Sequence, residues 1–450
     1  MSQLSKYFAL ILLFLSGYHM KLSAQISDTA YPESLVSAIS VEELRNTIFE
    51  LTSPALEGRE LGSAGNMKAA DWLKYTFRQK NMTPLPALGS FFHHFPVNRF
   101  EPEQVLLLVN QDTLLLHEDF TPAYFSANTS GFKEIEIADI SFHHYEEMMN
   151  IHELVYFGHA NEYQAVFLVT EEFTGTSGYR YEYKIDLPTR ATKTFENTSQ
   201  PHVESVTSEI PIIFISPETY NKIQHTTSIG LSIELKPVER RTAQNIIGYI
   251  GPEFFDETST QYVLVTSHFD HEGMHPVSGI PFFGAVDNAS GIAAMLESIR
   301  LLNFVSSRLT HPIVFIAQNG RKRDNAGLQK LLREYGLVYN NVILHLEIDS
   351  PSSAPRGQDN PPLEITFHNL PETHKEYLGV LGTAYELSSF TQSTEIPSIF
   401  AQKHIKVGGG YYPYRDRILD SPDKVNMTQL YYTTLFITEL LWNYATISSE

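Results

Sequence analysis

Apolar positions change their spacing twice along the chain. They recur every three or four residues over 41–51 and 67–79, which predicts two amphipathic helices near the beginning. From about 95 to 241 they gather instead in short β-like runs between polar stretches. Examples of these runs are 105–109, 165–169 and 210–215. The pattern therefore predicts a helical opening followed by a β-rich middle segment.

From Asn245 onward, strand-like and helix-like patterns alternate. The predicted elements are strands at 262–266, 312–317 and 342–348, helices at 290–302 and 326–335, and a last helix at 427–444. The order βαβαβ predicts a mostly parallel sheet covered by helices, and 420–423 are expected to provide the turn and cap before the last helix. Ligands of such sheets bind where the strands end, so the polar residues after each strand are the site candidates.

Three of these candidates suit a metal ion. His268 ends the first strand, where a hydrogen-bonded surface histidine is the alternative, and Asp270 is placed to orient its imidazole. Asp287 lies in the glycine-flanked loop 284–291, where it can either bridge two cations or cap the following helix. Asp349 ends an apolar strand, where a charge without a partner is costly. Together these side chains form a nitrogen and oxygen donor set suited to zinc.

Several ordered motifs resemble the zinc-dependent aminopeptidases with a two-metal site, whose relatives include glutamate carboxypeptidase, glutaminyl cyclase and the transferrin receptor. Besides the histidine and aspartate motifs, they are Leu56-Glu57-Gly58-Arg59 with Gly62, Asn245-Ile246-Ile247-Gly248, and 420–426. The resemblance implies a three-layer α/β sheet of the zinc-exopeptidase (phosphorylase/hydrolase-like) type, formed by 25–94 and 242–450. The β-rich insert at 95–241 is similar to a protease-associated domain.

The resemblance also implies that one of the two metal positions of the family is lost in this chain. It assigns His268, Asp287 and Asp349 to one zinc. The second zinc of the family uses a glutamate and a late histidine, and a neighbouring glutamate acts as general base.

This chain has Arg321 at the base position, Lys322 at the glutamate ligand and Asp416 at the late histidine. Arginine keeps its proton near neutral pH and a lysine ammonium repels a cation. We therefore expect at most one zinc, or none, with ion pairs from Lys322 to Asp287 and Asp416, and from Arg321 to Asp349 or Asp270.

Composition narrows the cellular location and the partners. The chain has no cysteine, which excludes disulfides, thiolate zinc sites and a cysteine nucleophile, and its formal charge of -20 argues against nucleic acid. Lys6, the apolar run 7–18 and small residues at 22–24 predict a signal peptide over 1–24, with a short anchor helix as the alternative. No later run reaches ~18 apolar residues. We expect a periplasmic or extracellular protein without a stable membrane span.

Two functions remain open at this point. The leading expectation is an exported, degenerate metallo-aminopeptidase homologue, a pseudoenzyme that binds a peptide or protein. The alternative is an active exopeptidase with one zinc at His268, Asp287 and Asp349. The sequence argues against a serine hydrolase, because no Gly-x-Ser-x-Gly elbow joins a strand to a helix. The tyrosines at 411, 412 and 414 either line a peptide pocket or pack on the last helix.

Overall fold

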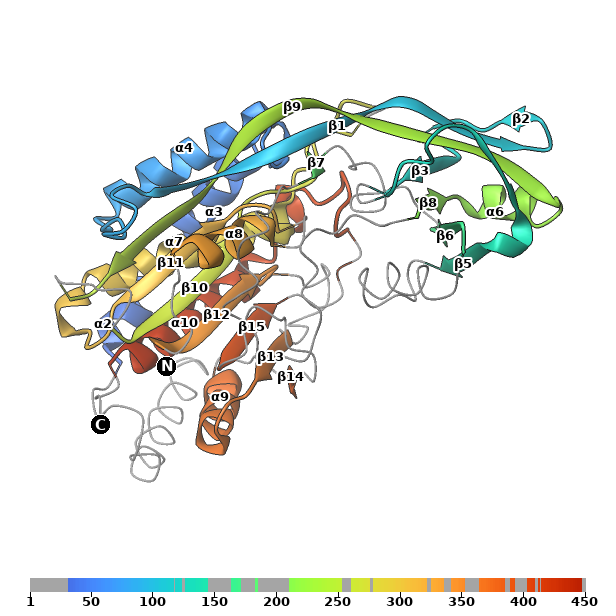
Figure 1. Cartoon of the computed structure of the whole chain (residues 1–450). Helices are drawn as coiled ribbons and strands as arrows, with labels where there is room; N and C mark the ends of the chain where they lie inside the picture. Colours follow the sequence, from blue (N-terminus) through green and yellow to red (C-terminus); the bar gives the residue numbers. More distant parts are fainter. Residues whose placement is uncertain are drawn as a thin grey trace.

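A computed structural model describes most of the chain (Figure 1). The described residues are 31–116, 118–123, 126–144, 163–170, 183–184, 210–252, 260–275, 278–321, 325–335, 341–352, 364–384, 389–392, 403–408, 412 and 414–446. The predicted signal peptide and Lys322 lie outside them. Among the described residues, no helix combines the length and apolar character needed to cross a bilayer.

A large sheet forms the centre of the molecule. Its main path runs through β14 (Ser389–Gln392), β13 (Glu364–His368), β15 (His404–Gly408), β12 (Val342–Asp349), β10 (Tyr262–His268), β11 (Ile313–Gln318), β9 (Ser228–Ile250), β1 (Phe92–Val109) and β2 (Asp112–Thr113). β4 (Lys133–Glu136) pairs with β9, and β7 (Tyr183–Lys184) pairs with β1. β10 lies between β11 and β12 and is parallel to both, and β15 is parallel to β12. The carboxyl ends of these four strands therefore lie along one edge.

Helices cover both faces of this sheet, which gives three layers. One core joins the sheet to α3 (Val41–Leu51), α4 (Ala64–Gln79), α7 (Ser290–Asn303), α9 (Glu372–Ala384) and α10 (Met427–Ala445). The opposite core joins it to α8 (Ala326–Tyr335) through Leu328 and Leu331. Shorter helices among the described residues include α2 (Glu33–Val36), η1 (Pro54–Arg59), η2 (Ile137–Asp139), η5 (Ala285–Ala289), η6 (Ser306–Arg308) and η8 (Pro422–Lys424). The α/β fold predicted from the sequence is confirmed.

Local capping explains where several helices begin. The side chain of Ser40 accepts a hydrogen bond from the Glu43 amide at the start of α3, and Ser63 does the same for α4. For α10 the capping residue is Asn426, which accepts from the Gln429 amide. The turn expected before this helix is present as η8, but the cap expected within 420–423 is not, because Asn426 caps α10 and Asp420 instead contacts the site.

A long two-stranded ribbon links the large sheet to a smaller one. β1 and β9 pair antiparallel along nearly their whole lengths and extend away from the helices in Figure 1. The smaller sheet has the order β3 (Phe120–Pro122), β8 (Ile212–Ile215), β6 (Ala165–Val169) and β5 (Ile140–His144), with α6 (Pro217–Ile223) beside it. Apolar side chains of both sheets share one buried core. Positions 95 and 241 fall inside the ribbon strands.

Candidate metal centre and its ion pairs

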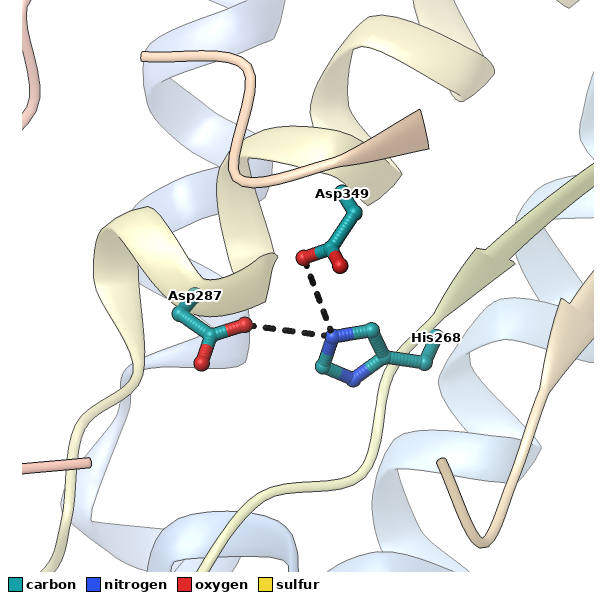
Figure 2. Close-up of side chains that lie close together, drawn as sticks. All are labelled: His268, Asp287 and Asp349. Carbon is teal, nitrogen blue, oxygen red and sulfur yellow. Dashed lines mark hydrogen bonds and ion pairs between the residues drawn. The ribbon is translucent and has the colours of Figure 1, made fainter. Parts of the chain in front are cut away.

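The three candidate ligands meet at the carboxyl ends of the parallel strands. His268 ends β10, Asp349 ends β12, and Asp287 lies in η5, just before α7. Figure 2 shows the imidazole of His268 directed at both carboxylates. Its Nε2 is 3.2 Å from Asp287 Oδ1 and 3.8 Å from Asp349 Oδ1, and all three residues are buried. One ligand atom from each lies within 4.8 Å of the others.

Asn288 ties the ends of β10 and β12 to the loop that carries Asp287. Its side-chain nitrogen is 3.0 Å from Ser267 Oγ, 3.1 Å from the His268 carbonyl and 3.2 Å from the Ile348 carbonyl. Its oxygen accepts a 2.8 Å hydrogen bond from the Ser350 amide. The helix-cap alternative is not adopted, because the residue that precedes α7 is Ala289, without a side-chain cap.

The buried guanidinium of Arg59 binds the segment after His268 and the loop before Asp287. It donates to the carbonyls of Phe269 at 2.7 Å, Phe283 at 3.0 Å and Gly284 at 3.2 Å, and to that of Leu51. Burial lowers the pKa of Arg59 to about 10. The arginine of the motif at 56–59 is thus a structural clamp on the two loops that carry the candidate ligands.

Asp420 fixes the backbone at Asp287. Its carboxylate accepts hydrogen bonds from the amides of Val286 at 2.9 Å and Asp287 at 3.0 Å, and from the Tyr412 hydroxyl at 3.0 Å. Burial, together with the nearby charge of Asp287, raises the pKa of Asp420 to about 7. Tyr412 is buried and bonded to this carboxylate, so it takes part in the packing around the site.

His268 is oriented by a main-chain group. Its Nδ1 is 3.1 Å from the carbonyl oxygen of Asp270, whereas the Asp270 carboxylate is 3.7 Å away. That carboxylate instead accepts from the Arg321 amide at 3.2 Å. Although burial by itself lowers it, the hydrogen bond to Asp287 and the nearby carboxylate of Asp349 raise the pKa of His268 to about 9. The imidazole is then a cation that joins the two carboxylates.

Two further cations pair with the carboxylates at the end of β12. Lys406 Nζ lies 2.8 Å from Asp349 Oδ2, and the Arg321 guanidinium is 3.6 Å from the same oxygen and 3.7 Å from Glu347 Oε1. Burial raises the pKa of Asp349, but Lys406, His268 and Arg321 outweigh it and hold that pKa well below its usual range. Asp349 is therefore an ionised carboxylate already neutralised by protein side chains.

Sequence reasoning did not single out Lys406. The sequence feature that could have indicated it is a lysine inside the alternating segment 404–408. This segment forms β15, which is parallel to β12 and places Lys406 opposite Glu347. Gly408 ends this strand with φ 91°, and a Cβ there would lie 2.0 Å from the Asp349 carbonyl oxygen. Only glycine fits this close approach, which brings the lysine strand against the site.

Asp416 lies at the same end of the sheet. One of its ligand atoms falls within 4.8 Å of donors on His271 and Asp287, so Asp287 belongs to two potential ligand groups. His271, three residues after His268, was not among the residues predicted from the sequence. His345 is a buried cross-strand residue, with Nε2 2.8 Å from Thr266 Oγ1.

The donor set of His268, Asp287 and Asp349 fits zinc in its chemistry. The surrounding charges are less favourable to zinc than the donor set is. A metal ion at Asp349 would compete with Lys406 at 2.8 Å and Arg321 at 3.6 Å. When bound, zinc in such a site lowers the pKa of a water ligand and polarises a carbonyl. The described residues thus combine side chains that can bind a metal with cations that already pair with one of those side chains, Asp349.

Comparisons with known proteins agree with this architecture. Residues 245–323 match the model of Peptidase family M28, whereas no curated protein sequence matches the chain. The zinc aminopeptidase BSAP from Bacillus subtilis superimposes with a TM-score of 0.60 at 18% identity, covering 92% of this chain and 96% of that one.

Two further structures give similar values. The aminopeptidase from Aneurinibacillus sp. strain AM-1 has a TM-score of 0.59 at 14% identity, covering 92% and 96% of the two chains. The Peptidase M28 precursor from Shewanella amazonensis has a TM-score of 0.59 at 13% identity, covering 93% and 96%. The chain therefore has the fold of these zinc aminopeptidases, and its segment 245–323 is similar to the M28 peptidases.

Proposed function

We propose that the chain is an exported peptidase homologue that binds a peptide or protein segment without hydrolysing it. Two observations support this: a cation stands at the base position, and two cations neutralise Asp349. The aminopeptidases that share the fold provide the ligand class, since their names describe action at the amino ends of peptides.

The guanidinium of Arg321 carries the argument against hydrolysis. Burial alone lowers the pKa of Arg321, but Glu347 and Asp349, followed by other carboxylates, raise it above its ordinary value. The group therefore keeps its proton and cannot take one from an attacking water. Loss of a general base typically costs ~10² to 10⁴-fold in rate.

A second candidate is an active exopeptidase with one metal. The observation that favours it is the convergence of His268, Asp287 and Asp349 within 4.8 Å. This reading requires a base other than Arg321, and it requires zinc to outcompete the 2.8 Å pair between Lys406 and Asp349.

Hydrolysis of aminoacyl anilides and short peptides separates the two candidates. Purified protein with added zinc should hydrolyse them at least ~10²-fold more slowly than the Bacillus subtilis aminopeptidase assayed in parallel. Peptides captured from a random mixture should be recovered with intact amino ends. Zinc-dependent hydrolysis that Asp287→Ala abolishes would establish the active exopeptidase instead.

Export is part of the proposal and rests on the segment 1–24. Protein recovered from outside the cytoplasm should begin near residue 25 when its amino end is sequenced. A mature protein that retains Lys6 and the apolar run after it contradicts export by signal cleavage.

A further inference from the structure

We propose that His271, Asp287 and Asp416 form a zinc site, in which His271 is a ligand that the family resemblance does not assign. The resemblance places the second metal at a glutamate and a late histidine, which are Lys322 and Asp416 in this chain. The inference goes beyond the proposed function, because a zinc can bind here whether or not peptides are hydrolysed.

The three donors already lie near the spacing that zinc needs. An imidazole nitrogen and one oxygen of each carboxylate are all within 4.8 Å of one another. Tetrahedral zinc with bonds of about 2.0 to 2.2 Å places its ligand atoms about 3.3 to 3.6 Å apart. The donors must therefore approach one another by at most about 1.5 Å for zinc to bind all three.

The fold holds His271 against the loop that carries Asp287. The amide of His271 donates to the Arg59 carbonyl at 3.1 Å, and the residue is 2% exposed. Gly284, at the start of this loop, has φ 56°, and a Cβ there would come within 2.6 Å of the His271 ring. Glycine is thus required where the ring packs on the loop, which brings the imidazole close to Asp287.

The turn that carries Asp416 is bonded to the same loop. The Asp420 carboxylate accepts from the amides of Val286 and Asp287, and its carbonyl accepts from the Ala285 amide at 3.0 Å. The Asp420 amide in turn donates to the Arg417 carbonyl at 3.1 Å. Asp416 itself has φ 58° and is half-buried, so this ligand is more exposed than His271 and Asp287, which are both buried.

Charge also favours this group over the one that contains His268. The latter depends on Asp349, whose Oδ2 is within 4 Å of both Lys406 and Arg321. The proposed site does not use Asp349. Zinc competes there with Arg415, which attracts both Asp287 and Asp416, and with His268, whose Nε2 is 3.2 Å from Asp287 Oδ1.

Zinc titration of the purified full chain, followed by calorimetry and by metal content after dialysis, tests the proposal. We expect about one tightly held zinc per chain, which corresponds to this group. His271→Asn and Asp416→Asn should each weaken zinc binding by more than the ~10 to 100-fold that loss of an outer-shell partner costs. Arg415→Gln should strengthen it.

Matched variants locate the metal. Asp349→Asn, which alters only the other group, and His225→Asn, at an exposed histidine, should keep the affinity of the original protein. The proposal is overturned if the original protein holds no zinc, if Asp416→Asn retains full affinity, or if Asp349→Asn weakens zinc as much as Asp416→Asn does. Circular dichroism establishes folding, and Asp416→Asn decides the outcome if His271→Asn does not fold.

Discussion

Replacing Lys406 by methionine should destabilise the protein, because it leaves Asp349 beside one cation fewer in a buried site. Methionine keeps most of the apolar stem and removes the ammonium that lies 2.8 Å from Asp349 Oδ2. At an effective dielectric constant of about 20, two unit charges at this distance attract by about 6 kcal/mol. The cost of desolvating the lysine offsets part of this attraction.

Removing one partner of a buried ion pair typically costs about 3 to 5 kcal/mol. The Lys406 side chain is 22% exposed, and Arg321 remains 3.6 Å from the same oxygen. We therefore expect a loss of about 3 kcal/mol in the free energy of unfolding, at the lower end of that range. Urea denaturation at neutral pH measures it.

Lys375→Met is the matched control. Lys375 pairs with Glu372 at 3.1 Å, but the glutamate is 76% exposed, so the variant should lose less than about 1 kcal/mol. A double-mutant cycle of Lys406→Met with Asp349→Asn should recover most of the loss as coupling between the two residues. If Lys406→Met costs no more than Lys375→Met, or if the cycle shows no coupling, the argument that this ion pair stabilises the site fails.

Three further predictions concern the framework of the site and the C-terminal helices. Asp420→Ala removes the acceptor of three buried donors and should cost about 3 kcal/mol or more in urea denaturation, whereas the exposed Asp423→Ala should change stability by less than about 0.5 kcal/mol. If both variants lost the same stability, the role of Asp420 in fixing the backbone at Asp287 would be refuted. Burial, and then a nearby lysine, lower the pKa of His374 to about 4. Because the unfolded histidine titrates near 6.5 and binds more protons, stability should fall by up to about 3 kcal/mol as pH drops from about 6.5 to about 4, and His374→Gln should show a smaller fall over that window. Gly408→Ala should lower the melting temperature more than Gly89→Ala, since both have positive φ but only the former places a Cβ against another backbone; similar shifts would contradict the close-approach argument.

Much of the fold follows from local pattern. The helices predicted at 41–51 and 326–335 have the bounds of α3 and α8, and the strands predicted at 262–266, 312–317 and 342–348 all form and pair in parallel. Strongly periodic segments specify their own conformation because one face of each must be buried. The antiparallel ribbon of β1 and β9 was predicted only as the fragment 105–109, because prolines such as Pro102 and Pro237 and several charged residues interrupt the apolar pattern of both strands.

The candidate site was predictable in one respect and not in another. His268 and Asp349 follow predicted strands, so their convergence at one sheet edge could be expected from the topology alone. Lys406, Asp420 and His271 could not be placed in this way. Each reaches the site through a strand pairing, a turn or a ring contact that the sequence does not encode locally.

The sequence by itself determined the α/β class and the candidate ligands at the strand ends, because both depend on residue type and local period, and the family resemblance placed Arg321 where a general base is expected. Only the tertiary structure decided which charges meet. It pairs Lys406 and Arg321 with Asp349, and it brings His271 and Asp416 to Asp287. The physical reason is that electrostatic interactions depend on distances of a few ångströms between segments far apart in the chain, and those distances are set by packing.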